Sequence, residues 1–142
     1  MTGSKISSKA KIGCNVKIGD FSIIQDYVWL FPNVVLTNDP HPPSENIQGC
    51  QVAEFASVGA KSVILPGVNI GKDSLIGAGS IVNRDVPPLK IVVGNPARII
   101  GDVRQIKFQS DPKKHVYPWR RQFHRGYPED IVRRWREEFP NE

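Results

Sequence analysis

Residues 52–86 read VAEFAS-VGAKSV-ILPGVN-IGKDSL-IGAGSI-VNRDV, and each group of six begins with isoleucine or valine. The same spacing precedes this stretch, which extends the series to twelve positions in a chain of 142 residues. Isoleucine, leucine and valine total only 35 residues, so composition alone does not produce twelve regularly spaced matches. The series comprises Ile6, Ile12, Ile18, Ile24, Leu30, Leu36, Val52, Val58, Ile64, Ile70, Ile76 and Val82.

A six-residue period excludes an ordinary amphipathic helix, because a repeat of about 3.6 residues would spread the aliphatic side chains around the helix surface. A chain that forms a short strand, turns and repeats would close a three-sided coil every three hexads, with the aliphatic residues on its axis. Hexapeptide periodicity is typical of parallel β-helices. We therefore predict an all-β solenoid of about four coils, in which glycines after the aliphatic residues, such as Gly59 and Gly77, relieve the turn geometry.

The outward position directly before each aliphatic residue indicates how the molecule associates. It is polar in several hexads, but it is apolar in three hexads that would stack on one face, at Val35, Val63 and Ile81. Single apolar residues are common on protein surfaces, whereas a contiguous apolar ladder indicates a subunit interface. Three-fold packing is the natural closed assembly for three-sided prisms, so we expect a homotrimer.

A loop of about residues 37–51 interrupts the repeat between Leu36 and Val52. Three prolines stiffen it and prevent a helix, and it contains His41, the one histidine that precedes residue 103. Polar excursions from a rigid scaffold often carry function. We therefore expect this loop to contribute to an active site.

The chain beyond the repeat divides into a closing segment and an extension. Residues 91–100 predict a last strand and turn that cover the open end of the β-helix domain, residues 1–102. Residues 103–142 form a basic, aromatic extension, in which a helix is expected at about 128–139. The apolar face of that helix should dock on the β-helix or on a neighbouring subunit through Ile131, Val132, Trp135 and Phe139.

Composition narrows the class of protein. Hydrophobic residues make up 39% of the chain and charged residues 23%, which is typical of a globular domain. No apolar run approaches the roughly 18 residues of a membrane span, and the first residues lack the apolar stretch of a secretory signal. Cys14 and Cys50 provide neither a disulfide framework nor a zinc site. We expect a cytoplasmic protein.

The hexads, together with three short segments, resemble the hexapeptide-repeat acyltransferases. The segments are Ile64–Gly71, Ile76–Val82 and Val93–Arg98, and the resemblance covers about residues 6–102. It implies a left-handed parallel β-helix with one inserted loop and a homotrimer with sites between subunits. It also implies acetyl-CoA, or another acyl-CoA, as co-substrate and no metal.

The inserted loop resembles two branches of this family. Thr37-Asn38-Asp39 resembles the sugar-nucleotide N-acetyltransferases, which implies transfer to the amino group of a nucleotide-linked amino sugar for surface polysaccharide or glycan synthesis. His41-Pro42 resembles the sugar O-acetyltransferases of the maltose and galactoside type, in which the histidine of this pair is catalytic. The first branch is our main hypothesis and the second is the alternative, so the acceptor is a nucleotide sugar or a small sugar.

Acyl transfer from a thioester needs a base for the nucleophile and a donor for the oxyanion. Histidine is a base near neutral pH, so His41 is the candidate catalytic base. Asn38 and Asp39 could orient its imidazole or hold the substrate, or they could simply bond to the turn backbone. The resemblance assigns the oxyanion to Gly59-Ala60 and the pantetheine arm to Gly77-Ala78, and basic side chains suit phosphates. The candidate cofactor-binding residues are Gly59, Ala60, Gly77, Ala78, Lys72 and Arg98.

Two other classes of function are less consistent with the sequence. A metal-dependent hydratase of the γ-carbonic-anhydrase type needs three histidines around one zinc, and His41 stands alone within the repeat region. A non-catalytic scaffold or nucleic-acid binder would rely on the extension, where basic and aromatic residues gather without a nucleic-acid motif. These basic and aromatic residues of the extension include His115, Tyr117, Trp119, Arg120, Arg121, Phe123, His124 and Arg125.

Overall fold

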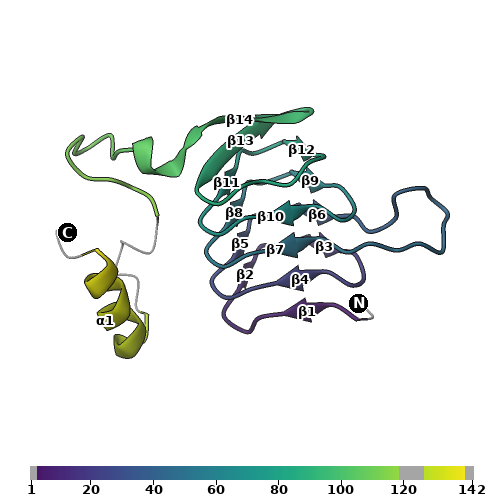
Figure 1. The fold of residues 1–142 in the computed structure, drawn as a ribbon, viewed down its shortest axis with the longest axis horizontal. Helices are drawn as coiled ribbons and strands as arrows, with labels where there is room; N and C mark the ends of the chain where they lie inside the picture. The colour runs from purple at the N-terminus through teal and green to yellow at the C-terminus, as the bar shows by residue number, and fades with distance from the viewer. Residues whose placement is uncertain (1–2, 119–126, 140–142) are drawn as a thin grey trace.

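Twelve two-residue strands form a three-sided coil in the computed structural model, which describes residues 3–118 and 127–139 (Figure 1). Each strand ends on one of the twelve periodic aliphatic residues, which confirms the predicted solenoid. The strands are β1 (Lys5–Ile6), β2 (Lys11–Ile12), β3 (Lys17–Ile18), β4 (Ile23–Ile24), β5 (Trp29–Leu30), β6 (Val35–Leu36), β7 (Gln51–Val52), β8 (Ser57–Val58), β9 (Val63–Ile64), β10 (Asn69–Ile70), β11 (Leu75–Ile76) and β12 (Ile81–Val82).

The strands stack in parallel as three sheets, which we call faces A, B and C. Face A has the order β1-β4-β7-β10, face B begins β2-β5-β8-β11, and face C has the order β3-β6-β9-β12. Paired residues lie one coil apart in sequence, as in Ile6 with Ile24. The sequence separation of paired residues is larger only where the inserted loop lies between the two strands, as in Ile24 with Val52. The predicted four coils are therefore confirmed.

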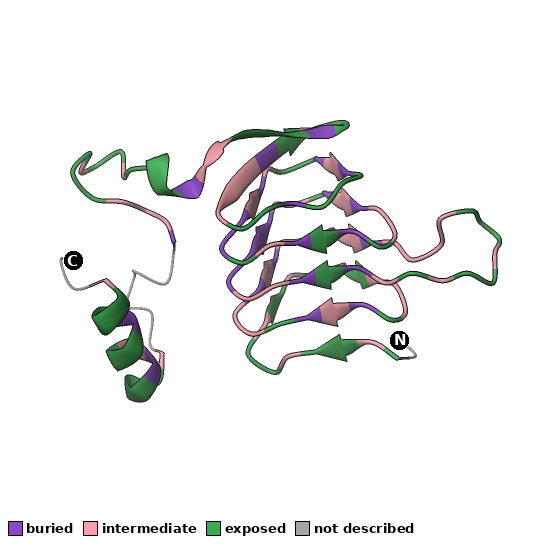
Figure 2. Ribbon diagram, viewed as in Figure 1, coloured by how far each residue is buried: buried purple, intermediate pink, exposed green. Residues whose placement is uncertain are grey.

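The periodic aliphatic residues form the core, as predicted, but burial is incomplete at one end of the coil. Figure 2 shows strand β1 at that end as exposed. The nine periodic residues from Ile24 to Val82 are all buried. In the first coil, Ile6 is 36% exposed and Ile12 is 42% exposed, because no further coil of the described chain stacks beneath them. The expectation that all twelve are enclosed was wrong for this coil.

The turns between strands use a left-handed backbone at a position that sequence reasoning did not identify. The residue three positions after the aliphatic residue has a positive φ in most hexads, for example Tyr27 at 59° and Phe55 at 62°. Glycines directly after the aliphatic residue serve a different purpose from the one predicted. A Cβ at Gly59 would lie 2.5 Å from the backbone nitrogen of Ala78, so glycine permits the coils to stack closely rather than to turn.

Two longer strands close the opposite end of the β-helix. β13 (Lys90–Gly94) extends face B in parallel with β11, and β14 (Ala97–Asp102) returns antiparallel to it. Val86, Val92 and Ala97 join the buried core there. This confirms that the segment after the repeat covers the end of the coil.

In the described residues of the extension, the structure has a 3₁₀ helix, η1 (Val103–Gln105), and an α-helix, α1 (Glu129–Glu138), which lies close to the predicted bounds. Ile131 and Trp135 of α1 are buried against Tyr27 and Phe55, whereas Val132 and Phe139 are half-buried. The predicted docking of the helix on the β-helix is thus observed. The aromatic and basic residues at 119–126 lie outside the described residues, and no helix within the described part could cross a membrane.

Replacement of a periodic aliphatic residue by alanine should lower the free energy of unfolding by different amounts in the middle of the coil and at its open end. Ile64→Ala removes a fully buried side chain and should lower the free energy of unfolding by about 2–5 kcal/mol. Ile6→Ala at the open end should cost about 1 kcal/mol or less, because its side chain is already partly hydrated. Urea unfolding of both variants measures the difference, and equal losses would contradict the assignment of the open end.

Candidate functional site

The inserted loop between β6 and β7 is folded around the carboxylate of Asp39. This carboxylate accepts a hydrogen bond from the backbone N–H of His41 at 3.0 Å. It also accepts from the backbone N–H of Ser44 at 2.8 Å and from the Ser44 hydroxyl at 2.6 Å. These bonds, that of the Ser44 hydroxyl foremost, hold the pKa of Asp39 below its usual value. Asp39 therefore positions the backbone of His41.

The base of the loop is held against the β-helix. The Asn38 carbonyl accepts from the backbone N–H of Gln48 at 2.7 Å, which joins the two ends of the loop. A Cβ at Gly19 would lie 2.8 Å from the Cβ of Asn38, so the glycine leaves room for this side chain. The Thr37 hydroxyl donates to the carbonyl of Ile64 at 2.8 Å. A firm base thus supports an exposed His41.

Four predicted cofactor residues line one groove on the β-helix. Gly59, Ala60, Gly77 and Ala78 occupy successive coils at the turn from face B to face C, and all four border a cavity of about 600 Å³. Ligand sites are usually concave and range from about 300 to 1,000 Å³. The structure thereby brings together residues that are 17 to 19 positions apart in sequence.

Sequence reasoning missed the aromatic walls of this groove. Trp29 and Phe31 border it from the coil below and stack with ring centroids 4.7 Å apart. The extension also borders the groove, through Phe108, Val116 and Tyr117. Trp29 has a detectable signal, since it occupies the outward position directly before Leu30, as Val35 does before Leu36. The extension has no periodicity that would relate it to the groove.

The loop and the groove lie on opposite edges of face C. The loop leaves the coil at the turn from face C to face A, after β6, whereas the groove follows the turn from face B to face C. Figure 1 shows the loop projecting away from the side of the β-helix on which the extension lies. No loop residue is among those that line the groove. One chain therefore does not bring His41 to Gly59-Ala60.

The two basic candidates do not line the groove. Lys72 borders a smaller cavity of about 290 Å³ near α1, where its ammonium lies 3.9 Å from the Glu54 carboxylate. Arg98 borders another cavity, of about 300 Å³, at the closed end of the β-helix, and its guanidinium donates to the carbonyl of Ala97 at 2.9 Å. In one chain, neither side chain is placed with the four groove residues.

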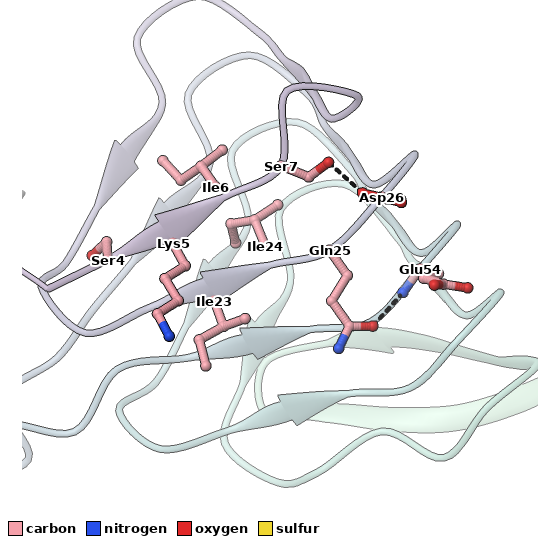
Figure 3. A pocket seen from close by; sticks show the side chains of 9 residues that line it. All are labelled: Ser4, Lys5, Ile6, Ser7, Ile23, Ile24, Gln25, Asp26 and Glu54. Atoms are coloured by element: carbon pink, nitrogen blue, oxygen red, sulfur yellow. Dashed lines mark hydrogen bonds between the residues drawn. The ribbon is translucent and has the colours of Figure 1, made fainter.

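A further hollow on face A has a different chemical character (Figure 3). It has a volume of about 610 Å³ and lies along β1 and β4. Within it the Ser7 hydroxyl bonds to the Asp26 carboxylate, and the Gln25 side-chain oxygen accepts from the backbone N–H of Glu54 at 3.2 Å. It has no histidine among its lining residues. Across residues 3–118 and 127–139, no group of three or more metal-binding side chains gathers.

No family model matches the chain. A galactoside O-acetyltransferase from Escherichia coli (strain K12) is 32% identical over an alignment of 127 residues, and the match covers 74% of this chain and 60% of the relative. A dTDP-3-amino-3,6-dideoxy-alpha-D-galactopyranose 3-N-acetyltransferase from Aneurinibacillus thermoaerophilus is 52% identical over 54 residues, 38% of this chain and 28% of the relative.

Among solved structures, a serine acetyltransferase in complex with CoA matches with a TM-score of 0.62 and 28% identity, over 69% of this chain and 40% of that chain. The chain thus spans at most 60% of the length of these three proteins.

The bonds of Asp39 predict a pH-dependent loop. Since the folded-state pKa lies below the usual 3.8, the carboxylate stabilises the loop above about that pH and loses this effect as the pH falls through the lower folded value. Asp39→Asn should accelerate hydrogen exchange of the His41 and Ser44 amides at neutral pH. The difference from the unmodified protein should vanish in strong acid.

Nuclear magnetic resonance of the two amides across this pH range provides the measurement. Glu45→Gln, a carboxylate change in the same loop, is the matched control and should leave both exchange rates unchanged. Equal amide protection in the Asp39→Asn protein at neutral pH would show that the carboxylate does not organise the loop.

Proposed function

We propose, because the chain belongs to the left-handed β-helix, hexapeptide-repeat acyltransferase family, that it transfers an acetyl group from acetyl-CoA to the amino group of a nucleotide-linked amino sugar. The observation that carries the proposal is the convergence of Gly59, Ala60, Gly77 and Ala78 on one groove. The relative that acts on a dTDP-linked amino sugar supports this choice of acceptor.

In the proposed reaction, the amino nitrogen of the acceptor attacks the thioester carbonyl carbon. The imidazole of His41 removes a proton from that nitrogen. The new carbon–nitrogen bond produces a tetrahedral oxyanion. Its collapse breaks the carbon–sulfur bond, and the departing thiolate takes up the proton. A positioned general base contributes about 10²–10⁴ in rate.

The oxyanion needs a donor that is not already engaged in the coil. The backbone N–H of Gly59 donates to the carbonyl of Ile76 at 2.8 Å, so we assign the oxyanion to the N–H of Ala60 instead. One backbone donor of this kind is worth about 10²–10³ in rate. Glycine at 59 retains a separate role, because a side chain there would meet the backbone of the next coil.

A complete site needs two chains. The side chains of Val35, Val63 and Ile81 stack on the outside of face C and are half-buried in the single chain. Packing face C against neighbours in a three-fold assembly would cover this ladder. Because the loop and the groove flank face C on opposite edges, the loop of one protomer would reach the groove of the next. We therefore propose a homotrimer with sites between subunits.

Acetylation of a sugar hydroxyl is the second candidate. It is supported by the Escherichia coli galactoside O-acetyltransferase, which matches a larger part of this chain than the amino-sugar relative does. His41 would serve both reactions, so the acceptor distinguishes them. Thiol release from acetyl-CoA with a panel of nucleotide-linked amino sugars and simple sugars tests the choice. Turnover with simple sugars alone would favour the second candidate, and turnover with neither would contradict both.

Replacement of His41 should lower the catalytic rate without changing the affinity for CoA. We expect His41→Asn to lower kcat by about 10²–10⁴, because the acceptor loses its base. Binding of CoA should remain within about 2-fold, since the proposed role of His41 is to deprotonate the acceptor and the groove residues that hold CoA are unchanged. Thiol-release kinetics and calorimetry measure these quantities, with Glu45→Gln as the control in the same loop. An unchanged kcat would exclude His41 as the base.

Disruption of the apolar ladder should separate the protomers. Val63→Asp places a charge in the middle of face C, and we expect the trimer to dissociate because burial of that charge is unfavourable. Gln51→Asp, at an exposed position on face A, is the matched control and should leave the trimer intact. Sedimentation analysis measures the mass of each protein. A monomeric parent protein, or a trimeric Val63→Asp protein, would contradict the proposed interface.

A further inference from the structure

We infer that the first part of the C-terminal extension, residues 103–118, is the outer wall of the acyl-CoA groove and contacts the pantetheine arm. This rests on the proposed function and deepens it, because it adds binding residues from a segment that lies outside the repeat. Phe108, Val116 and Tyr117 border the same cavity as Gly59 and Gly77. Three features of the structure support the inference: the segment is attached at its start, braced in its middle and held at its end.

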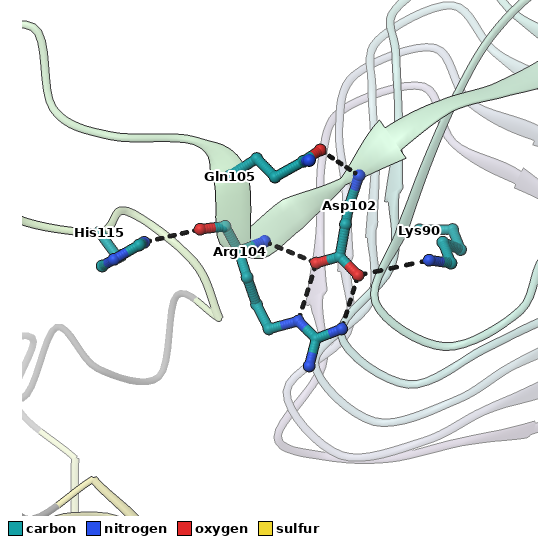
Figure 4. A network of polar contacts seen from close by, with 5 residues as sticks. All are labelled: Lys90, Asp102, Arg104, Gln105 and His115. Atoms are coloured by element: carbon teal, nitrogen blue, oxygen red, sulfur yellow. Dashed lines mark hydrogen bonds and ion pairs between the residues drawn. The ribbon is translucent and has the colours of Figure 1, made fainter.

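The start of the segment is attached through Asp102, the last residue of β14 (Figure 4). Its carboxylate accepts from Nε and Nη2 of Arg104 at 2.9 and 2.7 Å, and from Nζ of Lys90 at 3.4 Å. The bonds from the Arg104 side chain, above all, hold the pKa of Asp102 well below its usual range. The side-chain oxygen of Gln105 accepts from the backbone N–H of Asp102 at 3.0 Å, which completes a capping box for η1.

The middle of the segment is a short hairpin. The backbone N–H of Phe108 donates to the carbonyl of Lys114 at 3.1 Å, and that of Val116 donates to the carbonyl of Ile106 at 3.0 Å. Nδ1 of His115 lies 2.6 Å from the carbonyl of Arg104, which ties the returning strand to η1. The hairpin backbone therefore fixes the positions from which Phe108 and Val116 reach the groove.

The end of the segment is held by an aromatic cluster beneath α1. Tyr117 packs against the buried cluster of Phe55, Ile131 and Trp135. The rings of Phe55 and Trp135 meet edge to face, with centroids 5.3 Å apart, a favourable geometry for aromatic pairs. Tyr117 thus belongs both to the cluster that docks α1 and to the wall of the groove.

The chemistry of the wall favours the pantetheine arm as its occupant. Together with Trp29 and Phe31, the wall residues make the border of the groove mainly apolar and aromatic, which suits a chain of methylenes and neutral amides. The same hairpin presents three exposed lysines, Lys107, Lys113 and Lys114, whose charge complements the phosphates at the other end of CoA. The sugar acceptor has no comparable apolar arm.

The test compares Phe108→Ala with Gln109→Ala, an exposed neighbour in the same hairpin that does not border the groove. We expect Phe108→Ala to weaken CoA binding by about 5- to 30-fold in calorimetry, since the aromatic contact with the pantetheine arm is lost. The KM for acetyl-CoA should rise, while the KM for the acceptor stays within about 2-fold. Pantetheine should inhibit the variant less than the parent, and adenosine 3′,5′-bisphosphate should inhibit both equally. Gln109→Ala should match the parent.

The outcomes separate this inference from the proposed function. If the parent protein binds CoA and Phe108→Ala binds it equally well, the extension is not part of the groove, although the proposed function stands. If the KM values for acetyl-CoA and acceptor rise together, the loss is a general structural one, and the inference is overturned. If the parent protein does not bind CoA, the proposed function itself fails. Inhibition of Phe108→Ala by adenosine 3′,5′-bisphosphate to the same extent as the parent would exclude an unfolded variant as the cause of weaker CoA binding.

Discussion

Close parallel stacking of the coils is the constraint on which the rest of the structure depends. Backbone N–H groups of one coil donate to carbonyls of the next coil. Gly59 donates to Ile76 at 2.8 Å, and Gly77 donates to Val92 at 2.9 Å. At Gly59 the turns of two coils come closer than a side chain would allow, since a Cβ there would meet backbone at 2.5 Å. The same small residues therefore maintain the stack and leave an open groove along one edge of it.

The distribution of functional groups follows from this geometry. A rigid prism has no interior space for a site, because aliphatic side chains fill its axis. In the proposed site the functional groups are therefore added at the edges, by the loop at one edge of face C and by the aromatic extension beside the other. Neither addition is complete alone. The proposed site therefore depends on assembly, which links catalysis to the apolar ladder of face C.

The sequence predicted the fold well, because the aliphatic residues repeat at a fixed period of six. The same period places Gly59 and Gly77 one coil apart, so that both border one groove, and their role in binding CoA stays a prediction. The sequence did not predict the left-handed turn residues, since Tyr27 and Phe55 are not residue types that favour positive φ. It identified Asp39, but not that its carboxylate binds Ser44 rather than an imidazole. The place of Phe108 in the groove could not be predicted, because it depends on where an aperiodic extension packs after leaving β14.

Activity of mixed trimers tests most directly whether one protomer's loop serves another's groove. His41→Asn removes the base, and Ala78→Trp fills the groove at an exposed position, so each variant alone should be inactive. In trimers assembled from equal amounts of both, a quarter of the sites would combine an intact loop with an intact groove. We therefore expect about a quarter of the parent turnover per site. Mixed trimers that form but remain inactive would contradict a site shared between chains.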